Sequence, residues 1–582
     1  MLSIIQAQKD WRKLAVIIIL AMTVAVGASL PDIINYLTLK QNYEPFYFPF
    51  TSEPQFDEVT FYAPAASYFK ENLTIPHETE IYEYKNIVNV KFFLPSAIEG
   101  GLAALTGNTR LSWIIIRLVF AALVFLLAYA LARKLTGDRT IALFAVLILC
   151  TLGFGPRTFL SLIPERISQP IFFSRMNSPL VVLPFLLAGL IGLTKINTDR
   201  FRSGIAITGI ASGLLFYTYY FHQIAFILTL IMLTICYFFL KEWRKMAAVI
   251  AASIIANILA VPWYLQYLKA LKLSPGYITR WSAASYRPSF PVVIAAIAII
   301  AAIFILKRKQ KKIGTEKISY LPMEILIISA AGIQLIVSPL SPLIIQASHF
   351  YQQIVNSFGL FVIAILGGNY LVGKRRLRYL LPALGIILIV TLFIKQFAVW
   401  RQIAVFSASR DNEKIAEKLV EKNLSKEDVL AIANPYLNSV FPARLWRFRF
   451  YAFVSLSNVR DDENLERYVF TQRLFDKPWS GVDGQLAADP KTVLSSVKTI
   501  SIPSLLTSKL SLSPLQRNDL KKFYDSASND FINDKKITHA VALNAEEENG
   551  LIAGGKKLNL KTELIDKKDN VSLYKISAVG GQ

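Results

Sequence analysis

Two adjacent carboxylates, Asp57 and Glu58, are the residues of this sequence best suited to do chemistry. A carboxylate can take a proton from a hydroxyl group or help to hold a metal ion. The pair stands at the head of a helix-like stretch, residues 57–69. Acidic residues are also favoured in the first turn of a helix, where the helix dipole stabilises them. A simple helix start is therefore the alternative interpretation.

Arginines form the second set of candidates, because a guanidinium group stays charged and binds phosphate through two donors. Those in predicted outer loops are Arg157, Arg166, Arg175, Arg280 and Arg287. Arg175 stands out because it lies at the mouth of a predicted span. The alternative is that these arginines anchor the ends of spans among lipid headgroups.

Three further residues lie at or inside predicted spans. Arg117 is about six residues inside one of them, where a charge needs a partner, a cavity or a path to the surface by snorkelling. His222 and His349 fall at outer span ends among aromatic and amide residues. Such surroundings suit contact with a sugar or phosphate, and they equally suit an aromatic belt at the membrane interface.

The composition is that of a membrane protein. The 582 residues are 54% hydrophobic and only 18% charged, and the mean hydropathy is +0.43. These values exclude a soluble enzyme, a disordered chain and a fibrous protein. The net charge of +23 lies mostly in short clusters between apolar runs, which indicates membrane topology rather than nucleic-acid binding. Cys150 and Cys236 stand in separate runs and offer neither a disulfide framework nor a zinc site.

The apolar runs predict a polytopic α-helical membrane protein with about eleven transmembrane helices. We place the spans near residues 13–30, 111–132, 139–155, 179–194, 203–220, 223–240, 246–264, 289–306, 321–338, 354–373 and 379–396. Basic residues concentrate in every second connection, for example at Arg133, Lys134, Lys241 and the run 307–312. This bias places the N-terminus in the cytoplasm and the C-terminal part outside. The low cysteine count and the absence of eukaryotic retention signals favour a plasma (inner) membrane.

Two regions are predicted to lie outside the membrane. One is a long first outer loop, residues 31–110, within the transmembrane part at residues 1–400. The other is residues 401–582, which we interpret as an extracytoplasmic α/β domain. In it, residues 415–424 are expected to be helical, and residues 429–433, 540–543 and 571–576 are expected to be strands.

The motif around the acidic pair resembles the GT-C glycosyltransferases, and most closely their aminoarabinose-transferase and protein O-mannosyltransferase branch. The resemblance rests on Asp57-Glu58 followed by Tyr62 and Ala66, then on Lys91-Phe92-Phe93-Leu94-Pro95 and the basic hairpin 133–139. It covers about the first 200 residues. The chain departs from the family where Lys91-Phe92 replaces a frequent Lys-Pro, and residues beyond 400 match no known pattern.

The resemblance implies transfer of a sugar from a polyprenyl-phosphate donor to an extracytoplasmic acceptor, a protein, a lipid or a wall glycan. Asp57 would be the base and Glu58 its support, with Tyr62, His349 and His222 near the substrate. The arginines, Arg117 among them, would hold the phosphate. Some branches use a divalent cation such as Mg or Mn, for which Asp57 and Glu165 are the candidate ligands. Expected partners are the lipid-linked donor, the acceptor and membrane lipids, and no nucleic acid.

Two other functions remain open from the sequence. One is a transporter or flippase of lipid-linked sugars, although we see no paired halves of the kind transporters often show. The other is a GT-C-like scaffold without activity, whose C-terminal part binds a partner.

Overall fold

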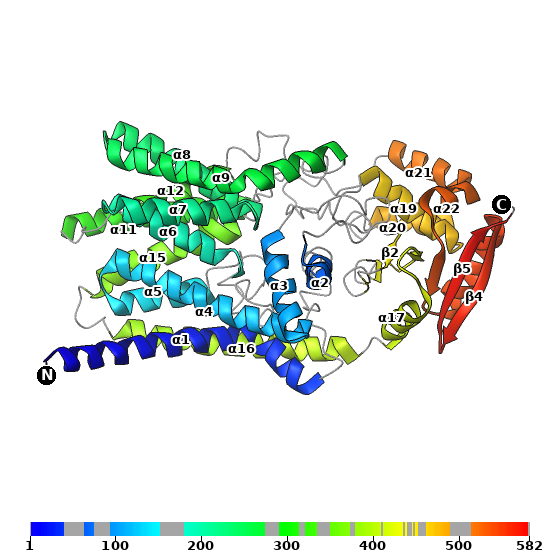
Figure 1. The fold of residues 1–582 in the computed structure, drawn as a ribbon, viewed down its shortest axis with the longest axis horizontal. Helices are drawn as coiled ribbons and strands as arrows, with labels where there is room; N and C mark the ends of the chain where they lie inside the picture. The colour runs from blue at the N-terminus through cyan, green and yellow to red at the C-terminus, as the bar shows by residue number, and fades with distance from the viewer. Residues whose placement is uncertain are drawn as a thin grey trace.

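The computed structural model describes residues 2–39, 63–74, 93–151, 180–273, 290–313, 320–333, 350–372, 379–408, 411–434, 437–438, 441, 445, 448–451, 461–488 and 514–579. Two parts follow one another along its long axis (Figure 1). The first is a helical bundle, and the second is a C-terminal α/β region.

Six helices of the described chain are long and apolar enough to cross a membrane. They are α1 (Leu2–Leu39), α4 (Thr109–Thr136), α8 (Tyr220–Phe239), α9 (Trp243–Leu273), α15 (Ser357–Val372), which continues the π-helix η9 (Tyr351–Asn356), and α16 (Leu380–Ala408). Such helices satisfy all interior backbone groups within one segment, which the apolar core of a bilayer requires.

Four shorter apolar helices complete most of the bundle, together with α11 (Phe290–Ile313), whose apolar first part ends in basic residues. The four are α5 (Arg139–Thr151), α6 (Leu183–Asn197), α7 (Phe201–Leu215) and α12 (Leu321–Gly332). At about 1.5 Å per residue they are shorter than the roughly 30 Å apolar core of a bilayer. Each of the eleven predicted spans coincides with one helix, but only six of these are both long and apolar enough to cross a membrane within the described residues.

Small residues let several of these helices approach closely, as is common for helices in membranes. A Cβ atom added at Gly192 of α6 would lie 2.8 Å from the backbone N of Thr208 in α7. One added at Gly209 of α7 would lie 2.8 Å from Ile255 Cβ in α9. The three helices therefore form one tightly packed layer.

The first span differs from the prediction at its end. Helix α1 does not stop near Pro31 but includes it and continues to Leu39. Proline removes one backbone donor, which a membrane helix tolerates when neighbouring helices supply other partners.

Two helices cross the end of the bundle that faces the C-terminal region, which we call the distal end (Figure 1). They are α2 (Ala63–Asn72) and α3 (Phe93–Thr106). The start of α3 is tied to the α7–α8 turn, where Leu94 N donates to Tyr217 O at 2.9 Å. Its other end leads directly into α4, whose first turn is capped by Asn108 Oδ1 accepting from Leu111 N. Helix α3 thus crosses the distal end from one side of the bundle to the other.

The C-terminal region contains a five-stranded sheet of order β2-β1-β3-β5-β4 in the described chain. Its strands are β1 (Val429–Ile432), β2 (Arg449–Phe450), β3 (His539–Ala542), β4 (Leu560–Lys568) and β5 (Val571–Ala578). Strand β1 is parallel to β2 and β3, whereas β5 is antiparallel to β3 and β4. The predicted α/β organisation is confirmed, and so are the three predicted strands and the helix near residues 415–424.

Helices cover both faces of this sheet. Helix α17 (Asp411–Asn423) packs on one face with Leu430, Ile432 and Val541. The other face is packed by residues of α19 (Asp461–Leu474), α22 (Asn529–Lys535) and α23 (Ala545–Lys557). Helices α20 (Trp479–Ala488) and α21 (Pro514–Ser526) form a smaller cluster with α19. Alternate residues of β1 and β3 point to opposite faces, so both faces are apolar.

The packing of α2 on α3 depends on Gly100, and this predicts the effect of two neighbouring substitutions. A Cβ atom at Gly100 would lie 2.3 Å from the carbonyl oxygen of Ala66, whereas one at Gly101 would meet only Phe69 Cε1 at 3.8 Å. Gly100→Ala should therefore destabilise the protein by about 1–3 kcal/mol through overpacking. Gly101→Ala should be neutral or stabilising by up to about 1 kcal/mol, because alanine favours helix. Thermal unfolding of the purified protein in detergent measures both, and equal effects would contradict this packing.

A buried histidine predicts a pH effect on the sheet. His539 lies at the amino end of β3, with its Nδ1 2.8 Å from Thr538 Oγ1 and 3.6 Å from Asp428 Oδ1. Burial lowers the pKa of His539, with Asp428 opposing and Lys575 adding to that effect. A lowered pKa means that the folded state prefers the neutral ring, so stability is full above the unfolded value of about 6.5 and falls at lower pH. The protection factors of amides in β1 and β3, which correct for the slower intrinsic exchange at acid pH, should be smaller at pH 5.5 than at pH 7.5. In His539→Gln this difference should be smaller, and an undiminished difference would contradict the assignment.

Candidate functional site

Most of the residues proposed from the sequence lie outside the described part of the chain. These are Asp57, Glu58, Tyr62, Arg157, Glu165, Arg166, Arg175, Arg280, Arg287 and His349. Two of the candidates, Arg117 and His222, can be placed. Both lie at the distal end of the bundle, which is therefore the candidate functional site.

Arg117 of α4 forms an ion pair with Asp32 of α1, in which Nη1 donates to Oδ2. The two side chains are only 2% and 5% exposed. Charges so deep in a helical bundle are stable only when paired, because an isolated ion there would lose its hydration. The expectation of a partner for Arg117 is thus confirmed, and its side chain does not snorkel to the surface.

The ion pair belongs to a larger polar layer between α1 and α16. The two helices run side by side in the same direction (Figure 1). They meet at Gly27, where an added Cβ would lie 2.8 Å from Leu392 and 3.2 Å from Phe393. Both helices rise by about 1.5 Å per residue. The polar residues that follow Gly27 in α1 and Phe393 in α16 therefore lie at similar heights along the helix axes, within about one turn of each other. We call this set the polar layer: Ser29, Asp32 and Asn35 of α1, Arg117 of α4, and Lys395 and Gln396 of α16.

Its members are all buried, and some have no hydrogen-bond partner in the part of the chain that the structure describes. These are both polar side-chain atoms of Asn35, the hydroxyl of Ser29 and the Nε2 of Gln396. Buried polar groups are normally satisfied, and an unpartnered one costs about 1–3 kcal/mol. The layer is therefore suited to contact with a further polar group.

A second polar group surrounds His222 in the first turn of α8. His222 is fully buried, with its ring 6.2 Å from that of Tyr219. The adjacent Phe221 contacts Phe350 at the start of η9, with ring centroids 5.1 Å apart. Complete burial is inconsistent with a lipid-facing aromatic belt. The starts of α8 and η9 therefore meet at the distal end, whereas His349 lies outside the described residues.

The π-helix η9 adds two buried amide side chains, Gln353 and Asn356, to this end. Single π-turns are often found at functional sites, because they shift the side chains that follow. Glu99 of α3 is also buried, with 2% exposure. Sequence reasoning missed these residues, and it also missed Asp32, Asn35 and Lys395. For Asp32 and Lys395, the signal that singled out Arg117, a charge beside or inside an apolar run, was available.

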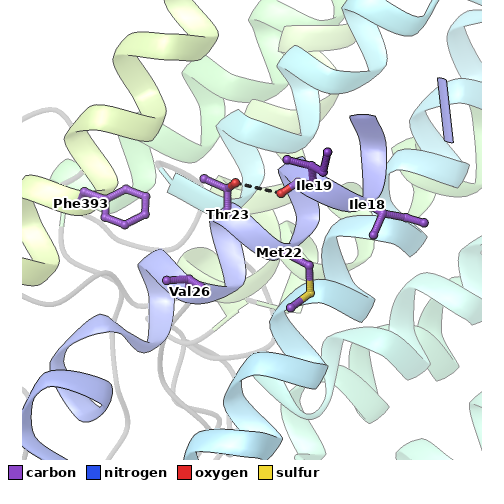
Figure 2. A pocket seen from close by; sticks show the side chains of 6 residues that line it. All are labelled: Ile18, Ile19, Met22, Thr23, Val26 and Phe393. Carbon is purple, nitrogen blue, oxygen red and sulfur yellow. Dashed lines mark hydrogen bonds between the residues drawn. The ribbon is translucent and has the colours of Figure 1, made fainter. Parts of the chain in front are cut away.

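A shallow groove lies on the outer surface of α1 and α16, toward the N-terminus of α1 from the polar layer (Figure 2). It is lined by Ile18, Ile19, Met22, Thr23, Val26 and Phe393. The one hydroxyl there, Thr23 Oγ1, donates to Ile19 O at 2.8 Å within its own helix. The groove is therefore wholly apolar toward its surroundings, as a lipid chain requires.

No group of three or more metal-ligating residues is present among the residues that the structure describes. The proposed ligands Asp57 and Glu165 lie outside that part, so the divalent cation remains a prediction. Comparison of the sequence with protein-family models and with curated proteins found no match.

The ion pair predicts a non-additive response to mutation. Asp32→Leu or Arg117→Leu alone should destabilise the protein by about 3–5 kcal/mol, because each leaves an uncompensated buried charge. The double variant Asp32→Leu/Arg117→Leu should recover most of that loss. Unfolding of the four proteins in the same detergent gives the coupling energy. Additive losses would mean that the two side chains do not stabilise each other.

Proposed function

We propose that the protein is a membrane glycosyltransferase, which moves a sugar from a polyprenyl-phosphate donor to an acceptor outside the cytoplasm. The observation that carries the proposal is the group of buried polar side chains at the distal end of the bundle. That end is also the one crossed by α2 and α3. A transferase for lipid-linked sugars needs such an end, with polar groups at the depth of the lipid phosphate and an apolar path for its chain.

In this proposal the acidic pair acts at this end. Glu58 precedes the first residue of α2 by five positions, and five residues span at most about 18 Å. Helix α2 is packed on α3 by Gly100 and by the rings of Phe69 and Phe93, 6.0 Å apart. The proposal requires the base to act within this reach of α2, at the membrane surface.

In the proposed reaction, Asp57 takes the proton from an acceptor hydroxyl, and Glu58 orients it or holds a cation. The hydroxyl oxygen attacks the anomeric carbon, and the bond to the lipid phosphate breaks, with inversion. Cationic side chains stabilise the departing phosphate. Arg157, Arg175, Arg280 and Arg287 remain candidates for that role. Arg117 acts on it only indirectly in this scheme, because Asp32 holds its guanidinium.

A transporter of lipid-linked sugars is the alternative that one observation favours. Ion pairs between membrane helices often mark the substrate path of transporters, and the Asp32–Arg117 pair is of that kind. The two functions differ in what the acidic pair does, because a transporter has no need of a base.

Mass spectrometry of lipid-linked sugars and surface glycans in cells tests the proposal. Strains would carry wild type, Asp57→Asn, Glu58→Gln, a deletion, and Glu71→Gln as a control on the exposed end of α2. Asp57→Asn should match the deletion, losing a glycan and accumulating a lipid-linked sugar, while Glu71→Gln behaves as wild type.

The comparison requires equal amounts of each variant in the membrane. If the deletion changes the glycans but both acidic-pair variants do not, the pair is only a helix start. A flux assay with a labelled lipid-linked sugar then separates the transporter from an inactive scaffold.

A further inference from the structure

Helix α9 has two faces that differ in burial. One face carries Ala252 and Ala256, which are buried against α7, where a Cβ atom added at Gly209 would lie 3.0 Å from the Ala252 carbonyl oxygen. The opposite face is exposed along the length of the helix. Its residues are spaced alternately three and four apart, and they are Ala247, Ile250, Ile254, Asn257, Val261, Tyr264 and Leu268. We call this row the α9 seam.

The spacing of the α9 seam is suited to a helix pair. Side chains that alternate three and four positions apart stay on the side of a partner helix in a left-handed pair, which is the commonest arrangement of membrane helices. Exposed apolar side chains alone would not indicate such a partner, because lipid chains cover them equally well. The α9 seam also contains Asn257, a residue that lipid chains do not suit.

Asn257 lies at the middle of the candidate membrane span Trp243–Lys269, 14 positions after its first residue and 12 before its last. Its Nδ2 donates to Ser253 O at 2.8 Å, and its Oδ1 accepts from Tyr264 Oη at 3.2 Å. A carboxamide has two N–H donors and two acceptor positions, so the described residues use one of each. The second donor lies at a depth where lipid chains offer no partner, and an unsatisfied polar group there is costly.

Pro262 places a second polar group near the same depth. Proline has no N–H, so the carbonyl of Ile258, four residues earlier, loses its usual helical donor. Ile258 directly follows Asn257 and is 64% exposed. The exposed face of α9 thus carries a side-chain amide and a main-chain carbonyl that can both take a hydrogen bond from outside the helix. Polar groups of this kind hold membrane helices together.

We propose that the α9 seam is the contact between two copies of this chain in the membrane. Two copies inserted with the same orientation present α9 in parallel, and a two-fold axis along the membrane normal places each seam residue opposite its equivalent. Each Asn257 then meets the Asn257 of the second copy. A carboxamide is self-complementary, because the remaining donor of one copy can bind the oxygen of the other. The inference does not depend on the proposed function.

Counting molecules in liposomes tests this inference. Full-length protein with one fluorophore per chain is reconstituted over a series of protein-to-lipid ratios, and photobleaching steps give the fraction of dimers. Asn257→Leu removes the amide from the exposed face. Thr234→Val on α8 is the control, because it removes a hydroxyl that donates to Leu230 O within its own membrane helix. Thermal unfolding checks that both variants are folded.

We expect wild type and Thr234→Val to dimerise with equal affinity. The affinity of Asn257→Leu should be lower by about three- to thirtyfold, as for the loss of hydrogen bonds between membrane helices. Monomers at every protein-to-lipid ratio, or equal dimerisation of Asn257→Leu and wild type, would overturn the inference.

Cysteine cross-linking locates the contact without changing Asn257. Ile254 of the α9 seam and Ile394 of α16 are matched positions, because they are 55% and 54% exposed. Both proteins carry Cys150→Ala and Cys236→Ala. Mild oxidation should link Ile254→Cys into a dimer, since equivalent positions of a close helix pair come within disulfide reach, and should leave Ile394→Cys a monomer. A cross-link in Ile394→Cys, or none in Ile254→Cys, would show that α9 is not the contact.

Discussion

The ion pair between Asp32 and Arg117 is the interaction on which the arrangement of the distal end depends. Two charges without hydration are stable in an apolar bundle only if they contact each other. This requirement fixes α1 against α4 at one level. It also explains how α1 can carry Pro31 and continue to Leu39, since the turn after the proline is anchored by a charged contact. With α1 in place, Gly27 brings α16 alongside it and completes the polar layer.

The other side of the bundle is organised by close backbone approach rather than by charge. Gly192, Gly204, Gly209 and Gly213 allow α6, α7 and α9 to pack with almost no side chain between them. Helix α3 then connects the two sides, because it is hydrogen-bonded to the α7–α8 turn at one end and continuous with α4 at the other. Helix α3 also carries the buried carboxylate of Glu99 at this end of the bundle.

The C-terminal region is joined to the bundle by the direct succession of α16 and α17. The first turn of α17 is held to the end of β3 by Asn412, so the carboxyl edge of the sheet starts where the last membrane helix ends.

The sequence by itself determined the class of protein and the position of its helices, because apolar runs and basic clusters report directly on the cost of burying polar groups in lipid. It also located three core strands, whose runs of buried residues are short and continuous. It could not give the end of α1. A proline usually ends a helix, but contacts with neighbouring helices keep α1 helical beyond Pro31. Nor did it single out Asn35, Glu99 or Gln353 as buried, because the burial of a single polar residue in or near an apolar run depends on partners that are distant in the sequence.

Only the tertiary structure brought Asp32 to Arg117, Phe221 to Phe350, and Asn412 to Leu543, which are pairs separated by 85, 129 and 131 positions in the chain. Such contacts depend on which helix faces are adjacent, and that is decided by the summed packing of the whole bundle and sheet.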